Sequence, residues 1–309
     1  MMAVARPSLL PRLFLLMMVA LPASAFLVLL RVATEGGVPF LGFVFWQCLA
    51  GAAMTGAALL ARRQSVPLSV PHLRYYTVSA LFGLVIPYVA MTLASPHLPV
   101  GVMSLAMAIE PALTYLVALV LLLERYRWIR FVGLLIGVAG LMLTVLPETS
   151  LPSRAMVPWV AVALVVPVGW ALWANWMARD WPPETESMAI SFAMMAGGAA
   201  ILLVPVVWLD QLWWFDAERL HLWWLVPLFG ALNVWLWLAS FETIRIAGPV
   251  FYATWTFAAT PMIIGAGIVV FGEQHSVWIW TAFALLLLSL CLVNVRNGQA
   301  PSTARTFGS

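Results

Sequence analysis

Residues 99–124 read PVGVMSLAMAIEPALTYLVALVLLLE, and this stretch decides how the rest of the chain is interpreted. As one helix it is long enough to cross the hydrocarbon core of a bilayer, which is roughly 30 Å thick. Glu110 lies near its middle, directly before Pro111, and Glu124 ends it. The stretch therefore predicts a membrane span with an acidic centre.

The whole chain has the same apolar character. Of its 309 residues 64% are hydrophobic and only 9% are charged, and the mean hydropathy is +1.00. About a quarter of the residues in soluble domains are charged, so a water-soluble fold could not cover this much apolar surface. Ten apolar runs of spanning length are expected and leave no room for a soluble domain. They lie at 13–31, 39–61, 75–95, 99–123, 128–147, 157–178, 188–209, 221–242, 248–271 and 276–295.

All fifteen basic residues are arginines, and their distribution predicts the orientation of the spans. With both termini in the cytoplasm, twelve arginines lie on the cytoplasmic side, and only Arg31, Arg154 and Arg219 lie on the other. Positive charge in short loops stays cytoplasmic. We therefore expect a multi-pass protein of a bacterial-type inner (plasma) membrane, with both termini in the cytoplasm.

The N-terminus also imitates a cleavable signal peptide. Arg6 and Arg12 precede an apolar run that contains Ala23-Ser24-Ala25, a pattern typical of a cleavage site. The run continues to Leu30, however, and so approaches the length of a span. We expect a retained first span.

Motifs in the first half of the chain recur in the same order in the second half. Leu81-Phe82-Gly83 and Leu93-Ala94-Ser95 return as Leu228-Phe229-Gly230 and Leu238-Ala239-Ser240. Other matching pairs are Pro22 with Pro167, Pro111 with Pro261 and Glu124 with Glu273. With five spans in each half, an odd number, the second half must be upside down relative to the first, as in many secondary transporters. We predict an all-α membrane protein with two inverted five-helix repeats, residues 1–150 and 151–309, around a central cavity.

The 5+5 layout, the central prolines, the terminal glutamates, and Gly133, Gly137 and Gly140 in span five resemble a known family. It is the ten-helix, EamA-like branch of the drug/metabolite transporter superfamily. The resemblance covers nearly the whole chain and implies a secondary exporter of small molecules. Trp170-Ala171-Leu172-Trp173 is similar to the YddG-like aromatic amino-acid exporters, in which an aromatic side chain of that span lines the cavity. Glu110 departs from those exporters, which have an aromatic residue there.

Glu110 is the acidic residue closest to the middle of any predicted span. A carboxylate at the bilayer centre costs about 2.5–3.5 kcal/mol on insertion scales, so it usually faces a cavity or a partner. One interpretation is proton coupling or binding of a substrate amine. The other is a protonated Glu110 that hydrogen-bonds a carbonyl freed by Pro111. Met107 and Thr114 share its helix face, with Tyr115 one position round.

Aromatic and polar residues at mid-membrane depth complete the predicted site. Tryptophan is more typical of the membrane surface, and aromatic planes with a few amides and hydroxyls suit a small aromatic or amphipathic solute. Helix–helix contact or lipid contact is the alternative role for such residues. The candidate substrate-binding residues are Tyr88, Met107, Glu110, Thr114, Tyr115, Trp170, Trp173, Asn233, Trp237, Trp255 and Thr260.

Mid-span prolines form the second candidate set. Each removes a backbone donor and frees a carbonyl, which lipid does not tolerate unless the kink faces protein or water. They are interpreted as hinges that shape a cavity, or as kinks that only serve packing. The set is Pro22, Pro87, Pro111, Pro167 and Pro261.

Several chemistries are not expected. No arginine lies at mid-span to bind a phosphate, and the four histidines fall at span ends, so neither a zinc site nor a cofactor is predicted. No nucleotide-binding or hydrolase motif occurs, and the scattered arginines do not favour nucleic acid. Cys48 and Cys291 are expected to be buried packing residues.

The sequence thus favours a transporter of a small-molecule substrate in the lipid bilayer, as a monomer or homodimer, and not an enzyme. The leading interpretation is export of small metabolites, such as amino acids including aromatic ones, by alternating access. Proton-coupled export of aromatic or lipophilic cations is the alternative. A lipid flippase or a membrane-embedded enzyme is a further, weaker reading.

Overall fold

The computed structural model describes residues 9–145, 151, 153–183, 185–213 and 221–293. Within these ranges every regular element is a helix and no strand occurs, which confirms the all-α prediction. Arg6, Arg219, Arg296 and Arg305, four of the arginines used to predict orientation, lie outside the described residues. The elements are α1 (Leu9–Glu35), α2 (Phe40–Ala61), α3 (Val70–Ser79), η1 (Ala80–Val85), α4 (Ile86–Ala94), η2 (Ser95–His97), α5 (Val100–Met107), α6 (Glu110–Val120), α7 (Trp128–Val145), η3 (Arg154–Met156), α8 (Val157–Ala163), α9 (Val165–Asp180), α10 (Ser187–Trp208), α11 (Leu225–Ala247), α12 (Pro249–Tyr252), α13 (Trp255–Phe271) and α14 (Val277–Val293).

Eight helical segments of the described chain are long and apolar enough to cross a membrane. They are Phe14–Glu35, Phe40–Ala61, Val70–His97, Val100–Val120, Arg154–Asp180, Ser187–Trp208, Leu225–Ala247 and Pro249–Phe271. Two shorter apolar helices, Trp128–Leu143 and Val277–Ser289, occupy the positions of predicted spans five and ten. The protein is a multi-pass membrane protein, and the count of ten spans stays a prediction.

Four of the long segments are broken inside the bundle: α3–α4, α5–α6, α8–α9 and α12–α13. Three breaks coincide with a predicted hinge proline. Pro87 and Pro111 lie in the first turns of α4 and α6, and Pro167 lies near the start of α9. A proline cannot donate its backbone hydrogen bond, but this is harmless in a first turn, where the bond is absent anyway.

The other two predicted hinges lie in unbroken helices. Pro22 is inside the long α1 and Pro261 is inside α13. The break in the α12–α13 segment instead falls at Ala253 and Thr254. A proline in a helix therefore does not by itself locate the break, because neighbouring helices can hold the kinked backbone in helical form.

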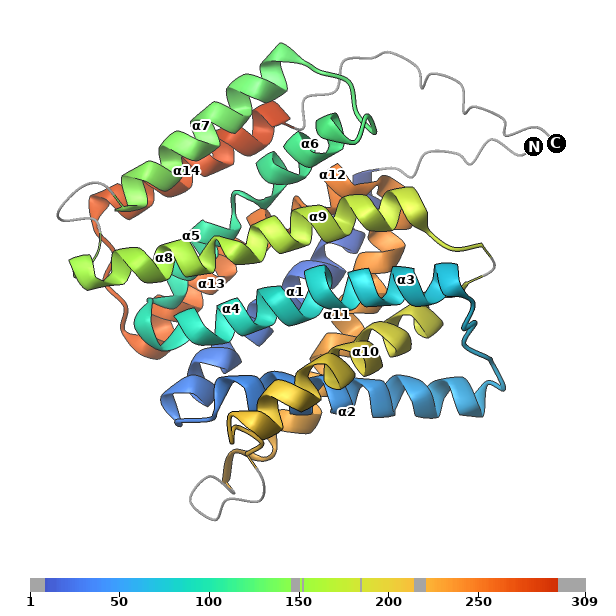
Figure 1. Ribbon diagram of the computed structural model, residues 1–309. Helices are drawn as coiled ribbons and strands as arrows, with labels where there is room; N and C mark the ends of the chain where they lie inside the picture. The colour runs from blue at the N-terminus through green and yellow to red at the C-terminus, as the bar shows by residue number, and fades with distance from the viewer. Residues whose placement is uncertain (1–8, 146–150, 152, 184, 214–220, 294–309) are drawn as a thin grey trace.

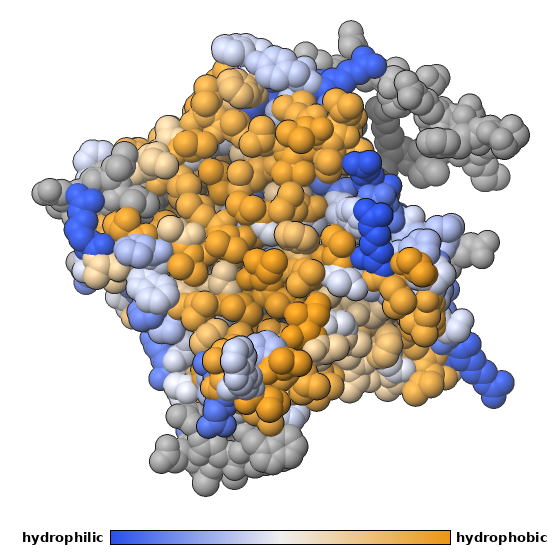
Figure 2. All heavy atoms as spheres, in the orientation of Figure 1, coloured by the Kyte–Doolittle hydropathy of each residue, from blue (hydrophilic) through white to orange (hydrophobic). Residues whose placement is uncertain are grey.

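The helices pack so that both halves of the chain share one centre. α1 packs against α11 and α13, α5 against α13, and α6 against α9. The pairs α2–α10 and α7–α14 lie on opposite sides of this centre (Figure 1). Apolar side chains cover most of the face in Figure 2, and hydrophilic ones gather towards the helix ends. This distribution suits an apolar surface in lipid with polar ends in water.

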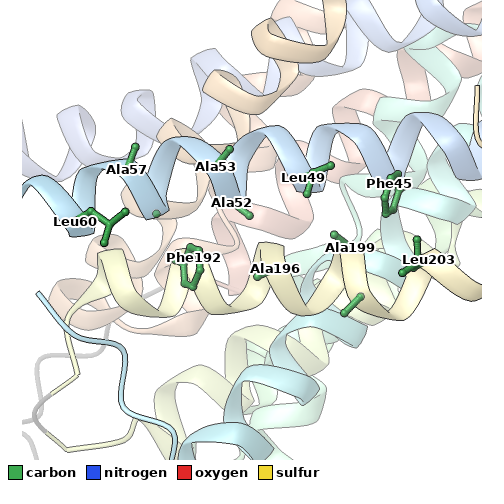
Figure 3. A pocket seen from close by; sticks show the side chains of 12 residues that line it. Phe45, Leu49, Ala52, Ala53, Ala57, Leu60, Phe192, Ala196, Ala199 and Leu203 are labelled. Carbon is green, nitrogen blue, oxygen red and sulfur yellow. The ribbon is translucent and has the colours of Figure 1, made fainter. Parts of the chain in front are cut away.

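An apolar groove of about 620 Å³ lies between α2 and α10 (Figure 3). Its walls consist only of Ala, Gly, Leu and Phe, among them Ala53, Gly56, Phe192 and Ala200. Leu49, Leu60 and Leu203 on its rim are exposed, so the groove opens to the outside of the bundle. Because no polar group lines it, it offers no means of recognising a polar metabolite.

Candidate functional site

A small cavity lies at the centre of the bundle, between α1, α4, α5, α9, α11 and α13. Its volume is about 20 Å³, room for one water molecule. Four of the predicted substrate-binding residues line it: Tyr88, Met107, Trp170 and Trp255. The remaining lining residues were not predicted, and they are Ala23, Phe26, Leu27, Met91, Leu236 and Ile263. Both halves of the chain therefore contribute to one central cavity.

Trp170 is held at this cavity by the irregular backbone of η1. This segment is a π-helix that contains the repeated Leu81-Phe82-Gly83 motif. Pro87, four residues after Gly83, has no N–H to donate to the Gly83 carbonyl. The indole Nε1 of Trp170 donates to that carbonyl instead, at 3.0 Å. A π-helix often marks a functional site, and here it supplies the acceptor that orients Trp170.

Replacing Trp170 by Phe is expected to destabilise the protein by about 1 kcal/mol, because the buried Gly83 carbonyl then loses its donor. The thermal unfolding midpoint in detergent should fall by roughly 2–4 °C. Trp235→Phe is the matched control, since Trp235 lies on α11 with 44% of its surface exposed. Equal midpoints for the two variants would show that the Trp170 hydrogen bond contributes nothing measurable.

A second group of aromatic side chains packs behind the cavity wall. Trp173 is fully buried, with its ring centroid 4.9 Å from that of Trp237 and 5.7 Å from that of Tyr252. Trp170 and Trp255 meet at 5.6 Å with an edge-to-face geometry, as aromatic pairs prefer. The indole N–H groups of Trp173, Trp237 and Trp255 have no hydrogen-bond partner among the described residues. Of these three, only Trp255 lines the cavity.

Glu110 is completely buried at the start of α6, one turn beyond Met107 of the cavity wall. Neither carboxyl oxygen has a hydrogen-bond partner within the described chain. The side chains of Trp255 and Tyr252 are among its polar neighbours. The predicted bond to a carbonyl freed by Pro111 is not formed, so Glu110 remains available to a proton or a cationic group.

Asn233 lies in a polar chain that crosses three helices. The hydroxyl of Tyr88 donates to its Oδ1 at 2.6 Å, and its Nδ2 donates to Oε1 of Gln47 at 2.9 Å. This chain joins α4, α11 and α2 beside the cavity. Asn233 is thus a helix–helix contact that holds Tyr88, which was one of its two predicted roles.

Three other predicted residues lie away from the cavity lining. Thr260 donates to the Thr256 carbonyl of its own helix at 2.6 Å. Thr114 is buried, and its hydroxyl has no partner within the described part of the chain. The Tyr115 hydroxyl accepts from the N–H of Arg127 at 2.9 Å and so fixes the α6–α7 connection. Tyr115 therefore has a structural role at a helix end.

The histidines, cysteines and carboxylates form no metal-binding group among the described residues. Cys48 is buried, as predicted, whereas Cys291 is exposed and that prediction was wrong. Cys291 lies on the surface of α14, and an apolar residue of a membrane helix can face lipid as well as protein, so its apolar sequence context did not imply burial in protein.

Comparison with known proteins finds a family match, one relative and one solved structure. The profile of the EamA-like transporter family matches residues 10–146. An uncharacterised transporter of Bacillus subtilis (strain 168), YvbV, is 24% identical over 236 residues, covering 74% of this chain and 74% of the relative. A crystal structure of another protein aligns with a TM-score of 0.62 and 20% identity, over 90% of this chain and 96% of that one, which supports the fold alone.

The EamA-like match and the transporter relative agree with the membrane-spanning helices. The protein is a membrane transporter and not an enzyme, as the sequence predicted. The resemblance to the drug/metabolite transporter superfamily is confirmed, while the YddG-like subtype stays a prediction.

Proposed function

We propose that this EamA-like protein is a secondary transporter that exports small metabolites by alternating access between two inverted five-helix halves. The central cavity is the proposed substrate site. Both termini are proposed to lie in the cytoplasm, and the membrane to be a bacterial-type inner membrane, because the arginines follow that orientation.

The helix packing supports the inverted halves. Spans one to five correspond to spans six to ten, so α1 corresponds to α9, α2 to α10, and η1 and α4 to α11, while α6 corresponds to α13. Under this correspondence, the contact of α1 with α11 matches the contact of α9 with α4 and η1. In the same way, the contact of α1 with α13 matches that of α9 with α6, and the contact of α2 with α11 matches that of α10 with η1. The remaining contacts, α2–α10, α5–α13 and α7–α14, each join two corresponding spans. Such a pattern is expected of two repeats related by an axis in the membrane plane.

The properties of the central cavity support the proposed substrate class. It is lined by aromatic rings, is nearly filled, and lies between helices that are broken close to it. Broken helices at mid-membrane are typical of transporter sites. The leading substrate class is small metabolites, above all amino acids including aromatic ones, whose ring would contact Trp170 and whose amino group would approach Glu110.

Export of aromatic or lipophilic cations is the second candidate, and Glu110 favours it. Its carboxyl group is buried and has no hydrogen-bond partner among the described residues. A zwitterionic amino acid also needs a partner for its carboxylate, whereas a cation needs only Glu110 and the aromatic rings. A proton would occupy Glu110 when the cation leaves.

Three matched probes separate these candidates: phenylalanine, phenethylamine and 3-phenylpropionate. They share the ring and differ only in which charged groups they carry. In inside-out vesicles that contain the protein, we expect uptake of phenylalanine, of phenethylamine or of both, stimulated by a pH gradient. Preferential uptake of phenethylamine selects the cation transporter. Uptake of 3-phenylpropionate alone, or of no probe, would contradict both substrate classes.

A further inference from the structure

The sequence repeats place a glutamate at the end of spans four and nine, Glu124 and Glu273, and the two have different contacts in the structure. Glu273 follows α13, and its carboxylate accepts from the N–H groups of Val100 at 2.5 Å and Gly101 at 3.1 Å. These donors belong to the first turn of α5, where helix N–H groups lack partners within the helix. Glu273 thus joins the end of span nine to the start of span four.

The contact is closely packed. A Cβ at Gly101 would lie 2.6 Å from the His275 ring, and a Cβ at Gly267 would lie 2.5 Å from Glu273 Oε2. His275 is itself 3.4 Å from the Glu273 carboxylate, and its side chain is 2% exposed. Both glycines are therefore required for the approach of Glu273 to α5.

Two further contacts hold the α4–α5 connection at this end of the bundle, which we call the Glu273 end. The Arg31 guanidinium of α1 donates to the carbonyls of Ser95 and Leu98, the latter at 2.7 Å. The rings of His97 and Trp159 stack with centroids 3.7 Å apart. Elements from both halves of the chain thus close the Glu273 end around the start of span four.

Burial alone would raise the pKa of the Glu273 carboxyl. His275 and the N–H groups of Gly101 and Val100 more than offset this, and the pKa lies below its ordinary value. A carboxyl with a lowered pKa contributes its stabilisation above the ordinary value and loses it only as the pH falls through the lowered one. The contact therefore persists throughout the neutral range.

The opposite end of the bundle, the Glu124 end, lacks the equivalent contact. Glu124 pairs with Arg130 at 3.2 Å, and its side chain is 36% exposed, against 11% for Glu273. Pro249 and Val250 open span nine as Pro99 and Val100 open span four, and Gly248, the residue before α12, has no side chain that could cap its first turn. Gly248 before it has open space where a side chain would lie.

We propose that Glu273 and Glu124 are alternating latches of the transport cycle, an inference that rests on the proposed alternating access. In the conformation described, Glu273 binds the first turn of α5 and closes the Glu273 end. In the opposite conformation, Glu124 leaves Arg130 and binds the first turn of α12, while Glu273 releases α5. In the predicted orientation the Glu273 end is the outer one, so this conformation is closed to the outside.

The reach of Glu124 supports the exchange. α6, which precedes it, packs against α12, just as α13 packs against α5. Tyr115 and Ala118 of α6 lie in one apolar cluster with Val250 of α12. A movement of the α6–α7 connection, at the end of α6, would bring the Glu124 carboxylate to the N–H groups of α12.

Thiol labelling without any substrate tests the latches. The labelling rate of Ser104→Cys measures access from the Glu273 end, because Ser104 lies five residues after Pro99 at the start of span four. The rate of Thr254→Cys measures access from the Glu124 end, because Thr254 lies five residues after Pro249 at the start of span nine. Both side chains are buried. The background is Cys291→Ser, because Cys291 is exposed and Cys48 is buried.

Glu273→Gln is expected to raise the labelling rate of Ser104→Cys about tenfold and to lower that of Thr254→Cys, because a charged acceptor is lost from two hydrogen bonds. Glu124→Gln is the matched variant and should shift the two rates in the opposite direction. Arg31→Gln removes another contact of the Glu273 end and should act like Glu273→Gln, which keeps the test available if one variant does not fold.

Unchanged Ser104→Cys labelling in folded Glu273→Gln and Arg31→Gln protein would overturn the latch proposal, and so would a shift in the same direction by Glu124→Gln. Because no substrate is used, the result stands apart from the vesicle uptake. Opposite shifts without uptake of any probe would support the latches and reject only the proposed substrates.

Discussion

Replacing Glu110 by Gln is expected to reduce uptake of phenylalanine or phenethylamine at least about tenfold and to remove its dependence on a pH gradient. Glutamine fills the same space but can neither carry a negative charge nor exchange a proton. A hydrogen bond to a charged group contributes about 1.5–3 kcal/mol, which corresponds to a tenfold loss or more. Uptake into inside-out vesicles, measured with and without the gradient, gives both values.

The folding of Glu110→Gln should be intact, because the Glu110 carboxyl oxygens have no partner in the described structure. Asp210→Asn is the matched control. It makes the same carboxyl-to-amide change at an exposed residue whose φ of 52° asparagine tolerates. If Glu110→Gln retains both the rate and the pH dependence of the Asp210→Asn protein, Glu110 is a structural residue and the cation candidate fails.

Replacing Gly169 by Ala is expected to destabilise the protein by about 1–3 kcal/mol, since it inserts a methyl group into a filled contact. The added Cβ would lie 2.8 Å from Cγ of Pro87 and 3.0 Å from the backbone oxygen of Phe82. A proline ring and a backbone carbonyl cannot move aside as a flexible side chain would. α9 would have to shift from α4, and Trp170 would move with it.

The thermal unfolding midpoint of Gly169→Ala in detergent should fall by several degrees, and uptake should fall further than stability alone explains. Gly265→Ala provides the control, because a Cβ there meets nothing within 4 Å. It should be neutral or slightly stabilising, as alanine favours a helix over glycine. A midpoint for Gly169→Ala at or above that of Gly265→Ala would contradict the close-contact argument.

The helical spans were predictable from apolar length alone. Eight segments and two shorter helices fall where the apolar runs predicted them. Their interruptions were only partly predictable. Pro87, Pro111 and Pro167 lie at breaks, but no proline lies at the break at Thr254.

The sequence predicted that aromatic residues would form the candidate site, but it predicted only some of the residues that line it. Trp170 and Trp255 were chosen because aromatic side chains at mid-membrane are unusual, and both line the cavity. Phe26 and Ile263 line it too, but they were not chosen, because an apolar residue in a membrane helix carries no sign of whether it faces lipid or cavity. In a soluble helix the polar face supplies that sign.

The sequence by itself determined the membrane class, the approximate spans, the matching motifs of the two halves and the unusual depth of Glu110. These properties depend on hydrophobic length and on residue order, which are visible in one dimension. Only the tertiary structure decided which groups have partners. It placed Tyr115 at a helix end and left Glu110 unpaired within the described residues. It also distinguished Glu273, bound to α5, from Glu124, paired with Arg130. The two glutamates look equivalent in sequence, and they differ because a hydrogen bond depends on atoms that come together only when distant helices pack.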